Sequence, residues 1–237
     1  MPEEPTEPRT RSERRLRRML REAVWWIRDY AYAAHWQLRA IVSHNDPAVF
    51  RSGDRTPIVV IPGVFETWRF LQPLIGELHD RGHPVHVVDA LAWNRRPVAE
   101  AAGHVGRYLE QHDLRGVVLV SHSKGGLVGK YAMTLGANAG RIDAMLAVAA
   151  PFGGSSYARF LVLPSLRMFR PRDATILALA REAAVNARIV SVFGRFDPHI
   201  PGGSRLDGAT NVELDTGGHF RVLAHPRVIA EAEVLAR

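Results

Sequence analysis

The feature that most constrains the fold is a regular alternation of short apolar runs and helix-like segments between residues 57 and 236. The runs are rich in Val, Ile, Leu and Ala and are bounded by Pro, Gly, Ser or Asp, which is typical of buried strands. They span residues 56–63, 83–90, 116–121, 141–151, 187–194 and 210–215. Strands that alternate with helices usually run parallel, and such a sheet is covered by helices on both faces. The sequence therefore predicts an α/β fold with a mainly parallel sheet of about six strands.

The segments between the strands have helical patterns of apolar residues. They span residues 68–82, 97–112, 124–136, 173–185 and 225–236. A chain of 237 residues is long enough for one well-buried domain, and we expect residues 43–237 to form it. In an open parallel sheet, ligands bind at the carboxyl ends of the strands, so candidate site residues are sought there.

The N-terminal region contains a long amphipathic pattern. Residues 1–12 are polar and predict a disordered tail, whereas residues 13–42 predict one helix. Its apolar residues recur every three or four positions: Leu16, Leu20, Val24, Ile27, Ala31, Ala34, Leu38 and Ile41. Trp25, Tyr32 and Trp36 form an aromatic line beside that face. One interpretation packs the apolar face on the domain; the other makes residues 13–42 a peripheral membrane contact, because an arginine-rich start and aromatic side chains suit a lipid headgroup layer.

Composition and charge exclude several classes of protein. The chain has no cysteine, which excludes disulfides and thiolate metal sites and fits a reducing compartment. No run is long enough to span a bilayer, and the N-terminus lacks the apolar segment of a secretory signal. We therefore expect a cytoplasmic protein, with a peripheral position at the inner membrane surface as the alternative. The net charge of +7 is spread along the chain without a nucleic-acid-binding motif, so no nucleic-acid partner is expected.

The segment SHSKGG, residues 121–126, joins the strand at 116–121 to the next helix. A serine hydroxyl at such a turn is a candidate nucleophile, although Ser and Gly also occur in purely structural turns. A hydroxyl needs a base that accepts its proton, a third group that orients the base, and donors for the oxyanion. The first helical turn after Ser123 offers the N–H of Lys124 at the positive end of the helix dipole.

SHSKGG resembles the G-x-S-x-G nucleophile elbow of the α/β-hydrolases, in the H-S-x-G-G form of bacterial lipases and esterases. Ser121 replaces the first glycine of the motif, where strand and helix pass close together and a small residue is needed. The resemblance covers residues 57–236. It implies that the first two strands of the family are missing and that the sheet has the order 4-3-5-6-7-8 in the family's numbering.

The resemblance implies a catalytic triad in the chain order Ser, Asp or Glu, His. After the strand at 187–194, the segment GRFDPHIP is similar to the family's acid loop and points to Asp197. After the strand at 210–215, TGGHFRVL is similar to the G-H-x-x-L segment and points to His219. His225 is a weaker rival, since it reads as the start of a helix. The predicted triad is Ser123, Asp197 and His219.

The resemblance also places the second oxyanion donor in the loop after the first strand. Pro62 and Gly63 occupy the place of the His-Gly pair found in many lipases, which makes the Val64 N–H the matching donor, with Phe65 as the alternative. The expected oxyanion hole is therefore formed by Val64 and Lys124.

The segment APFGGS, residues 150–155, looks like the T-P-x-x-G-[ST] stretch of lipases, and a cluster of apolar residues follows it. That cluster is interpreted either as core packing or as a small cap, at residues 152–186, over an acyl pocket. We expect substrate contacts from Phe65, Phe152 and Phe160.

Taken together, the resemblance implies a lipase-like serine hydrolase that cleaves carboxylic esters through an acyl-enzyme. The substrate would be an ester or lipid small molecule, with no cofactor and no metal. Two alternatives stay open: an acyltransferase on the same fold, and a catalytically silent hydrolase fold that binds lipid or protein. The sequence leaves acyl length, alcohol and oligomeric state undetermined.

Overall fold

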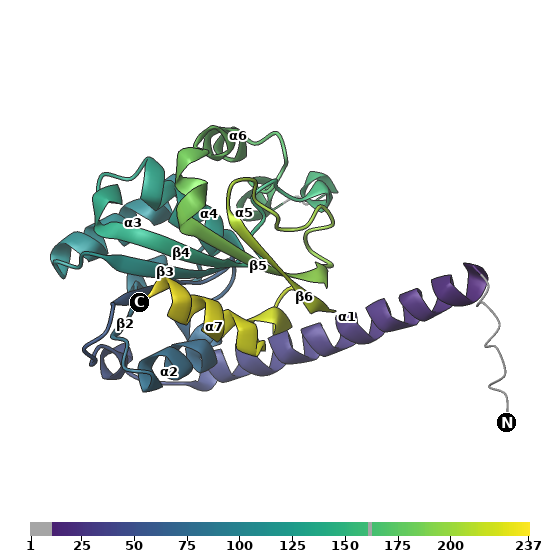
Figure 1. Ribbon diagram of the computed structural model, residues 1–237, viewed down its shortest axis with the longest axis horizontal. Helices are drawn as coiled ribbons and strands as arrows, with labels where there is room; N and C mark the ends of the chain where they lie inside the picture. The colour runs from purple at the N-terminus through teal and green to yellow at the C-terminus, as the bar shows by residue number, and fades with distance from the viewer. Residues whose placement is uncertain (1–10, 161–162) are drawn as a thin grey trace, which may run out of the picture.

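A computed structural model of the chain describes residues 11–160 and 163–237. Its six strands form one sheet in the order β2-β1-β3-β4-β5-β6, and every neighbouring pair is parallel (Figure 1). The strands are β1 (Ile58–Ile61), β2 (Val85–Val87), β3 (Val117–His122), β4 (Ile142–Val148), β5 (Ile189–Phe196) and β6 (Thr210–Gly217). The predicted α/β fold is confirmed, and the strand order is the one that the resemblance implied.

Helices cover both faces of the sheet because successive strand residues point in opposite directions. The helices are α1 (Arg11–Val42), α2 (Gln72–Asp80), α3 (Val98–Gln111), α4 (Lys124–Thr134), α5 (Pro164–Arg167), α6 (Ala174–Arg181) and α7 (Pro226–Leu235). In β1, Val59 and Ile61 join the core under α3, α4 and α6, whereas Ile58 and Val60 join the core under α2 and α7. Short 3-10 helices join these elements: η1 (Pro47–Phe50), η2 (Trp68–Leu71), η3 (Asp89–Leu91), η4 (Ala139–Arg141), η5 (Ser156–Phe160), η6 (Ala184–Arg188) and η7 (Arg221–Ala224).

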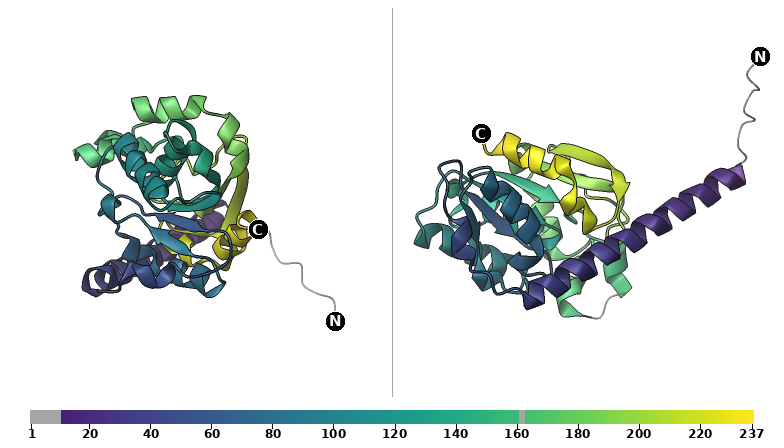
Figure 2. Two further views of the ribbon diagram at one scale, coloured as in Figure 1. Left: turned by 90° about the vertical axis from the view of Figure 1, so that its left-hand side faces the viewer. Right: turned by 90° about the horizontal axis from the view of Figure 1, so that it is seen from below.

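The helix α1 runs along the domain on the side of α2 and α7, and its N-terminal end projects beyond the sheet (Figures 1 and 2). It begins at Arg11, so Arg11 and Ser12 belong to a helix rather than to the tail that was predicted for residues 1–12; the rest of that segment lies outside the described residues. A shift of this size is common because helix ends are weakly determined by sequence.

The face of α1 that packs on the domain is the aromatic line, not the apolar one. Trp25, Tyr32 and Trp36 are half-buried, whereas Leu20 and Ile27 are 58% and 64% exposed. Of the two interpretations, packing on the domain agrees with the structure, but the packed face is the aromatic line and not the apolar one. The reason is shape: a Cβ on Gly217 of β6 would lie 2.4 Å from the Trp25 ring, so the missing side chain lets the aromatic line approach the sheet. None of the described helices combines the length and the hydropathy of a membrane span.

Candidate active site

Ser123 lies in a sharp turn between β3 and α4. Its backbone has φ 50° and ψ −120°, a conformation that costs a non-glycine residue about 1–3 kcal/mol and is typical of functional sites. Two glycines make the turn possible. A Cβ on Gly125 would lie 2.3 Å from the carbonyl oxygen of Ile61, and one on Gly126 would lie 2.4 Å from the Cβ of Ala150. The helix α4 therefore starts close to the sheet, and the Ser123 side chain lies at the edge of the sheet where the strands end.

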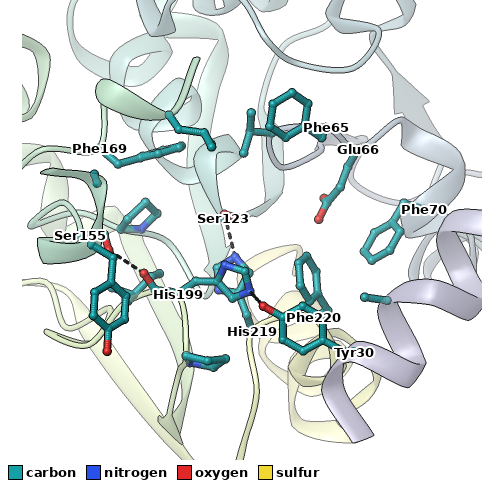
Figure 3. Close-up of a pocket in the computed structure, with 18 of the residues that line it drawn as sticks. Tyr30, Phe65, Glu66, Phe70, Ser123, Ser155, Phe169, His199, His219 and Phe220 are labelled. Carbon is teal, nitrogen blue, oxygen red and sulfur yellow. Dashed lines mark hydrogen bonds between the residues drawn. The ribbon is translucent and has the colours of Figure 1, made fainter. Parts of the chain in front are cut away.

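The structure brings the three residues of the predicted triad together (Figure 3). Nε2 of His219 lies 2.9 Å from Oγ of Ser123, and Nδ1 of His219 lies 2.8 Å from Oδ2 of Asp197. All three residues are less than a tenth exposed. This chain of hydrogen bonds can move a proton from the serine hydroxyl to the imidazole while the carboxylate stabilises the resulting cation.

The carboxyl group of Asp197 is held in its ionised form. Its second oxygen, Oδ1, accepts the backbone N–H groups of His199 at 2.7 Å and Ile200 at 3.0 Å. Burial alone would raise the pKa of Asp197, but His219 and the N–H of His199 outweigh it and hold that pKa below its usual value. The rival histidine, His225, lies outside this cluster, since its ring accepts the N–H of Arg227 and caps α7.

The backbone at His219 is held by a residue that the sequence analysis missed, Asp29 of α1. The Asp29 carboxylate is fully buried and accepts the N–H groups of His219 at 2.8 Å, Phe220 at 2.8 Å and Arg221 at 2.7 Å. Gly218 has φ 120°, and a Cβ there would lie 2.4 Å from Oδ1 of Asp29. The N-terminal helix is therefore part of the support of the site. One sequence feature could have pointed to Asp29: it is an acidic residue between Trp25 and Tyr32, on the face of α1 that packs on the domain.

A second buried pair joins the loop after β1 to the histidine. Nδ1 of His122 lies 2.9 Å from Oε2 of Glu66, and its Nε2 lies 3.0 Å from the carbonyl oxygen of His219. The same Glu66 oxygen accepts the N–H of Gly63 at 2.7 Å. Burial lowers the pKa of His122, but Glu66 and the His219 carbonyl outweigh it and raise the pKa above its usual value. A protonated His122 can donate to both partners, and it thereby links the loop after β1 to the backbone of His219.

The loop after β1 leaves one amide available for an oxyanion. The N–H of Phe65 donates to the carbonyl of Trp93 at 2.8 Å, so Phe65 is not free to serve as the alternative donor. Gly63 and Glu66 also donate within the loop. In the described part of the chain, the Val64 N–H has no such partner, and Val64 lines the same cavity as Ser123.

Lys124, the other predicted donor, offers only its backbone to the site. Its side chain is fully buried, and its Nζ donates to the carbonyl of Asn94 at 2.7 Å and to that of Arg96. Burial lowers the pKa of Lys124 to about 8. The ammonium group thus points away from the cavity, while the N–H stands at the first residue of α4.

Ser123 and His219 open into an apolar cavity of about 680 Å³. Its walls come from several parts of the chain and include Tyr30, Phe65, Leu166, Phe169, Ile200 and Phe220. Of the three predicted substrate contacts, only Phe65 lines it. Phe152 is 8% exposed and packs in the core beside α3 and α4, and Phe160 is 69% exposed on the surface. Part of the segment 152–186 does form a wall, through Ser155, Tyr157, Ala158, Leu166 and Phe169.

The ring of His199 lies over the ring of His219. The two ring centroids are 4.6 Å apart, and Nε2 of His199 lies 3.0 Å from the hydroxyl of Tyr30 (Figure 3). Burial, together with the nearby His219, lowers the pKa of His199 to about 4. His199 is therefore neutral at pH 7 and adds no charge beside His219.

This lowered pKa predicts a loss of stability in mild acid. The unfolded chain takes up a proton on His199 near its ordinary pKa of 6.5, whereas the folded chain does so only near 4, so stability falls as the pH drops between these values. We expect His199 to contribute about 2 kcal/mol to the decrease between pH 7 and pH 5. Urea unfolding at both pH values, on the wild type and on His199→Gln, measures it. Buried His86, whose pKa is also lowered to about 4, is present in both proteins and contributes equally to both decreases. An equal total decrease in the two proteins would therefore contradict a contribution from His199.

No family model and no curated protein matches the sequence. Solved structures do match. The mature lipase BlEst2 of Bacillus licheniformis has a TM-score of 0.62 at 17% identity, over 83% of this chain and 96% of that one. A structure from the metagenome-derived lipolytic enzymes LipS and LipT has a TM-score of 0.58 at 15% identity, over 78% and 94%. An α/β-hydrolase fold protein from Burkholderia ambifaria has a TM-score of 0.56 at 16% identity, over 78% of this chain and 92% of that one. The chain therefore has the α/β-hydrolase fold.

Proposed function

We propose that the protein is a serine hydrolase that cleaves carboxylic esters through an acyl-enzyme. The observation that carries the proposal is the hydrogen bond of 2.9 Å between Oγ of Ser123 and Nε2 of His219, at the wall of an apolar cavity. The likeness to lipolytic enzymes agrees with it.

In the first half of the reaction, Oγ of Ser123 attacks the ester carbonyl carbon and His219 takes the hydroxyl proton. Asp197 holds His219 in the tautomer whose Nε2 accepts that proton, and it stabilises the imidazolium. The N–H groups of Val64 and Lys124 bind the oxyanion. His219 then gives its proton to the departing alcohol, which leaves the acyl group on Ser123.

In the second half, water enters and His219 takes a proton from it while the hydroxide attacks the acyl carbon. The bond between that carbon and Oγ of Ser123 then breaks, His219 returns the proton to Oγ, and the acid leaves. No metal or cofactor takes part in these steps. Among the described residues, no group of three or more His, Asp and Glu side chains is arranged to hold a metal ion.

The cavity favours an apolar acyl group. Its walls are mainly aromatic and aliphatic, which excludes water from the ester and stabilises a hydrocarbon chain by burial. A volume of about 680 Å³ is in the range of pockets that hold a small organic ligand. We propose carboxylic esters with apolar acyl chains as the substrate class.

A fluorophosphonate probe and a panel of p-nitrophenyl esters test this function. We expect the probe to label Ser123, as mapped by peptide mass spectrometry, and hydrolysis to depend on acyl length. Adding competing alcohols separates the two reactions, because an acyltransferase would form new esters instead of free acid. A catalytically silent fold would give neither labelling nor product, which would overturn the proposal.

A further inference from the structure

The outward side of α1 is an apolar surface that the domain does not cover. We call the outer face of α1 the set Leu16, Leu20, Val24, Ile27, Ala31, Ala34, Leu38 and Ile41. These residues recur every three or four positions, so they form one stripe along the helix. Leu16, Ile27, Leu38 and Ile41 are each more than half exposed. The N-terminal part of α1, which carries the first residues of this face, projects well beyond the sheet (Figure 2).

Except for Glu13 near its N-terminal end, the charges of α1 lie away from the outer face. The helix has eight arginines and three acids. At 100° per residue, Arg17 and Arg28 flank the stripe, and Arg18 lies on the opposite side. Of the acids, Asp29 is buried under the triad loop, and Glu22 pairs with Arg18 at 2.7 Å. The polar side of the projecting helix is therefore strongly basic.

These features favour an anionic lipid surface over a second copy of the chain. A helix pair uses a narrow apolar seam with opposite charges on its flanks. Here the apolar side is wide, since Met19, Trp26 and Tyr30 continue it at 57%, 47% and 39% exposure, and its other flank is purely basic. Apolar and aromatic residues on one side with arginines on the other are typical of helices that lie in a membrane interface.

We propose that α1 holds the protein on an anionic lipid surface, with its outer face in the boundary between headgroups and acyl chains. The surface that does this is the aliphatic stripe, because Trp25, Tyr32 and Trp36 are occupied by packing on the domain.

The mouth of the cavity opens beside that face. Ala34 is exposed on the outer face and also lines the cavity, as do Tyr30 and Gln37 of the same helix. Gln37 donates to the carbonyl of Phe65, which stands at the rim and is 36% exposed. A helix seated in lipid would thus bring the cavity mouth to the surface. This position, which rests on the proposed function for its meaning, lets the protein take its ester substrates from the lipid surface itself.

Vesicle co-sedimentation of the full chain tests the proposal, with phosphatidylcholine vesicles compared with vesicles that contain 30% phosphatidylglycerol. We expect binding to the anionic vesicles. The double variant Ile27→Glu/Leu38→Glu should weaken it by roughly tenfold or more, because both changes place a charge in the apolar boundary. Arg17→Gln/Arg28→Gln should weaken it by a similar factor, through lost attraction to the anionic surface. The matched control is Leu177→Glu on α6, which is 46% exposed and far from α1 in sequence.

Equal binding of the wild type and the Ile27→Glu/Leu38→Glu variant, or no binding of the wild type, would overturn the proposal. A wild-type dimer in light scattering that becomes a monomer in this variant, without vesicle binding, would assign the outer face to a second copy instead. Hydrolysis of a soluble p-nitrophenyl ester should be unchanged in the variant. Because binding is measured without turnover, a failure of the proposed function would be seen separately, as an inactive wild type.

Discussion

Replacing Ser123 with alanine should lower kcat/KM for a p-nitrophenyl ester by roughly 10⁴- to 10⁶-fold. The change removes the hydroxyl oxygen that lies 2.9 Å from Nε2 of His219, so the proposed acyl-enzyme cannot form. What remains is the oxyanion hole and ordinary binding, which retain a small part of the rate enhancement. Steady-state kinetics and loss of labelling by a fluorophosphonate measure the effect.

The matched control is Ser156→Ala, an exposed serine in η5. It should keep full activity, and both variants should unfold at nearly the wild-type temperature. Ser123→Ala keeps the Cβ, so the strained turn at φ 50° is altered little. Retained hydrolysis in a folded Ser123→Ala protein would show that the nucleophile lies elsewhere.

Replacing Asp29 with alanine should have the second largest effect, on both stability and activity. It leaves three N–H groups without their acceptor, the buried one of His219 and the part-buried ones of Phe220 and Arg221. Each unsatisfied group costs about 1–3 kcal/mol, partly recovered if water enters. We expect a loss of roughly 3–5 kcal/mol in the free energy of unfolding. In the folded fraction, kcat should fall by roughly 10²-fold, because the imidazole is no longer held in line with Ser123.

Two further variants separate these effects from a general disturbance of α1. Asp29→Asn keeps the size and one acceptor oxygen, so it should fold and show a smaller loss in both readouts. Arg28→Ala, at the exposed neighbouring position, should change neither. Urea unfolding followed by kinetics on the folded variants provides both numbers. Wild-type kcat in a folded Asp29→Asn protein would contradict a positioning role for Asp29.

The sheet was predictable because its strands carry their own signal. β1, β3 and most of β4 are buried on both faces, so their sequences are continuous apolar runs. Parallel pairing follows from the helices between them. The strand order came from the resemblance and not from these patterns, since nothing in a single apolar run specifies its neighbours.

Candidate site residues were predictable where they stand at strand ends. Ser123, Asp197 and His219 each follow a different strand, and parallel strands bring their carboxyl ends to one edge of the sheet. Contacts that depend on three-dimensional packing were not predictable. Phe152 and Phe160 are neighbours of the site in sequence, yet one lies in the core and the other on the surface.

The helix α1 shows most clearly which features follow from local spacing and which depend on the folded chain. Its periodicity determined a helix with an aliphatic side and an aromatic side, because local spacing alone places residues on a helix surface. Which side packs was decided by the partner surface, where Gly217 leaves room for Trp25 and the N–H groups around His219 need the carboxylate of Asp29. Asp29 and His219 are 190 positions apart, so their pairing depends on two surfaces that meet only when the chain folds.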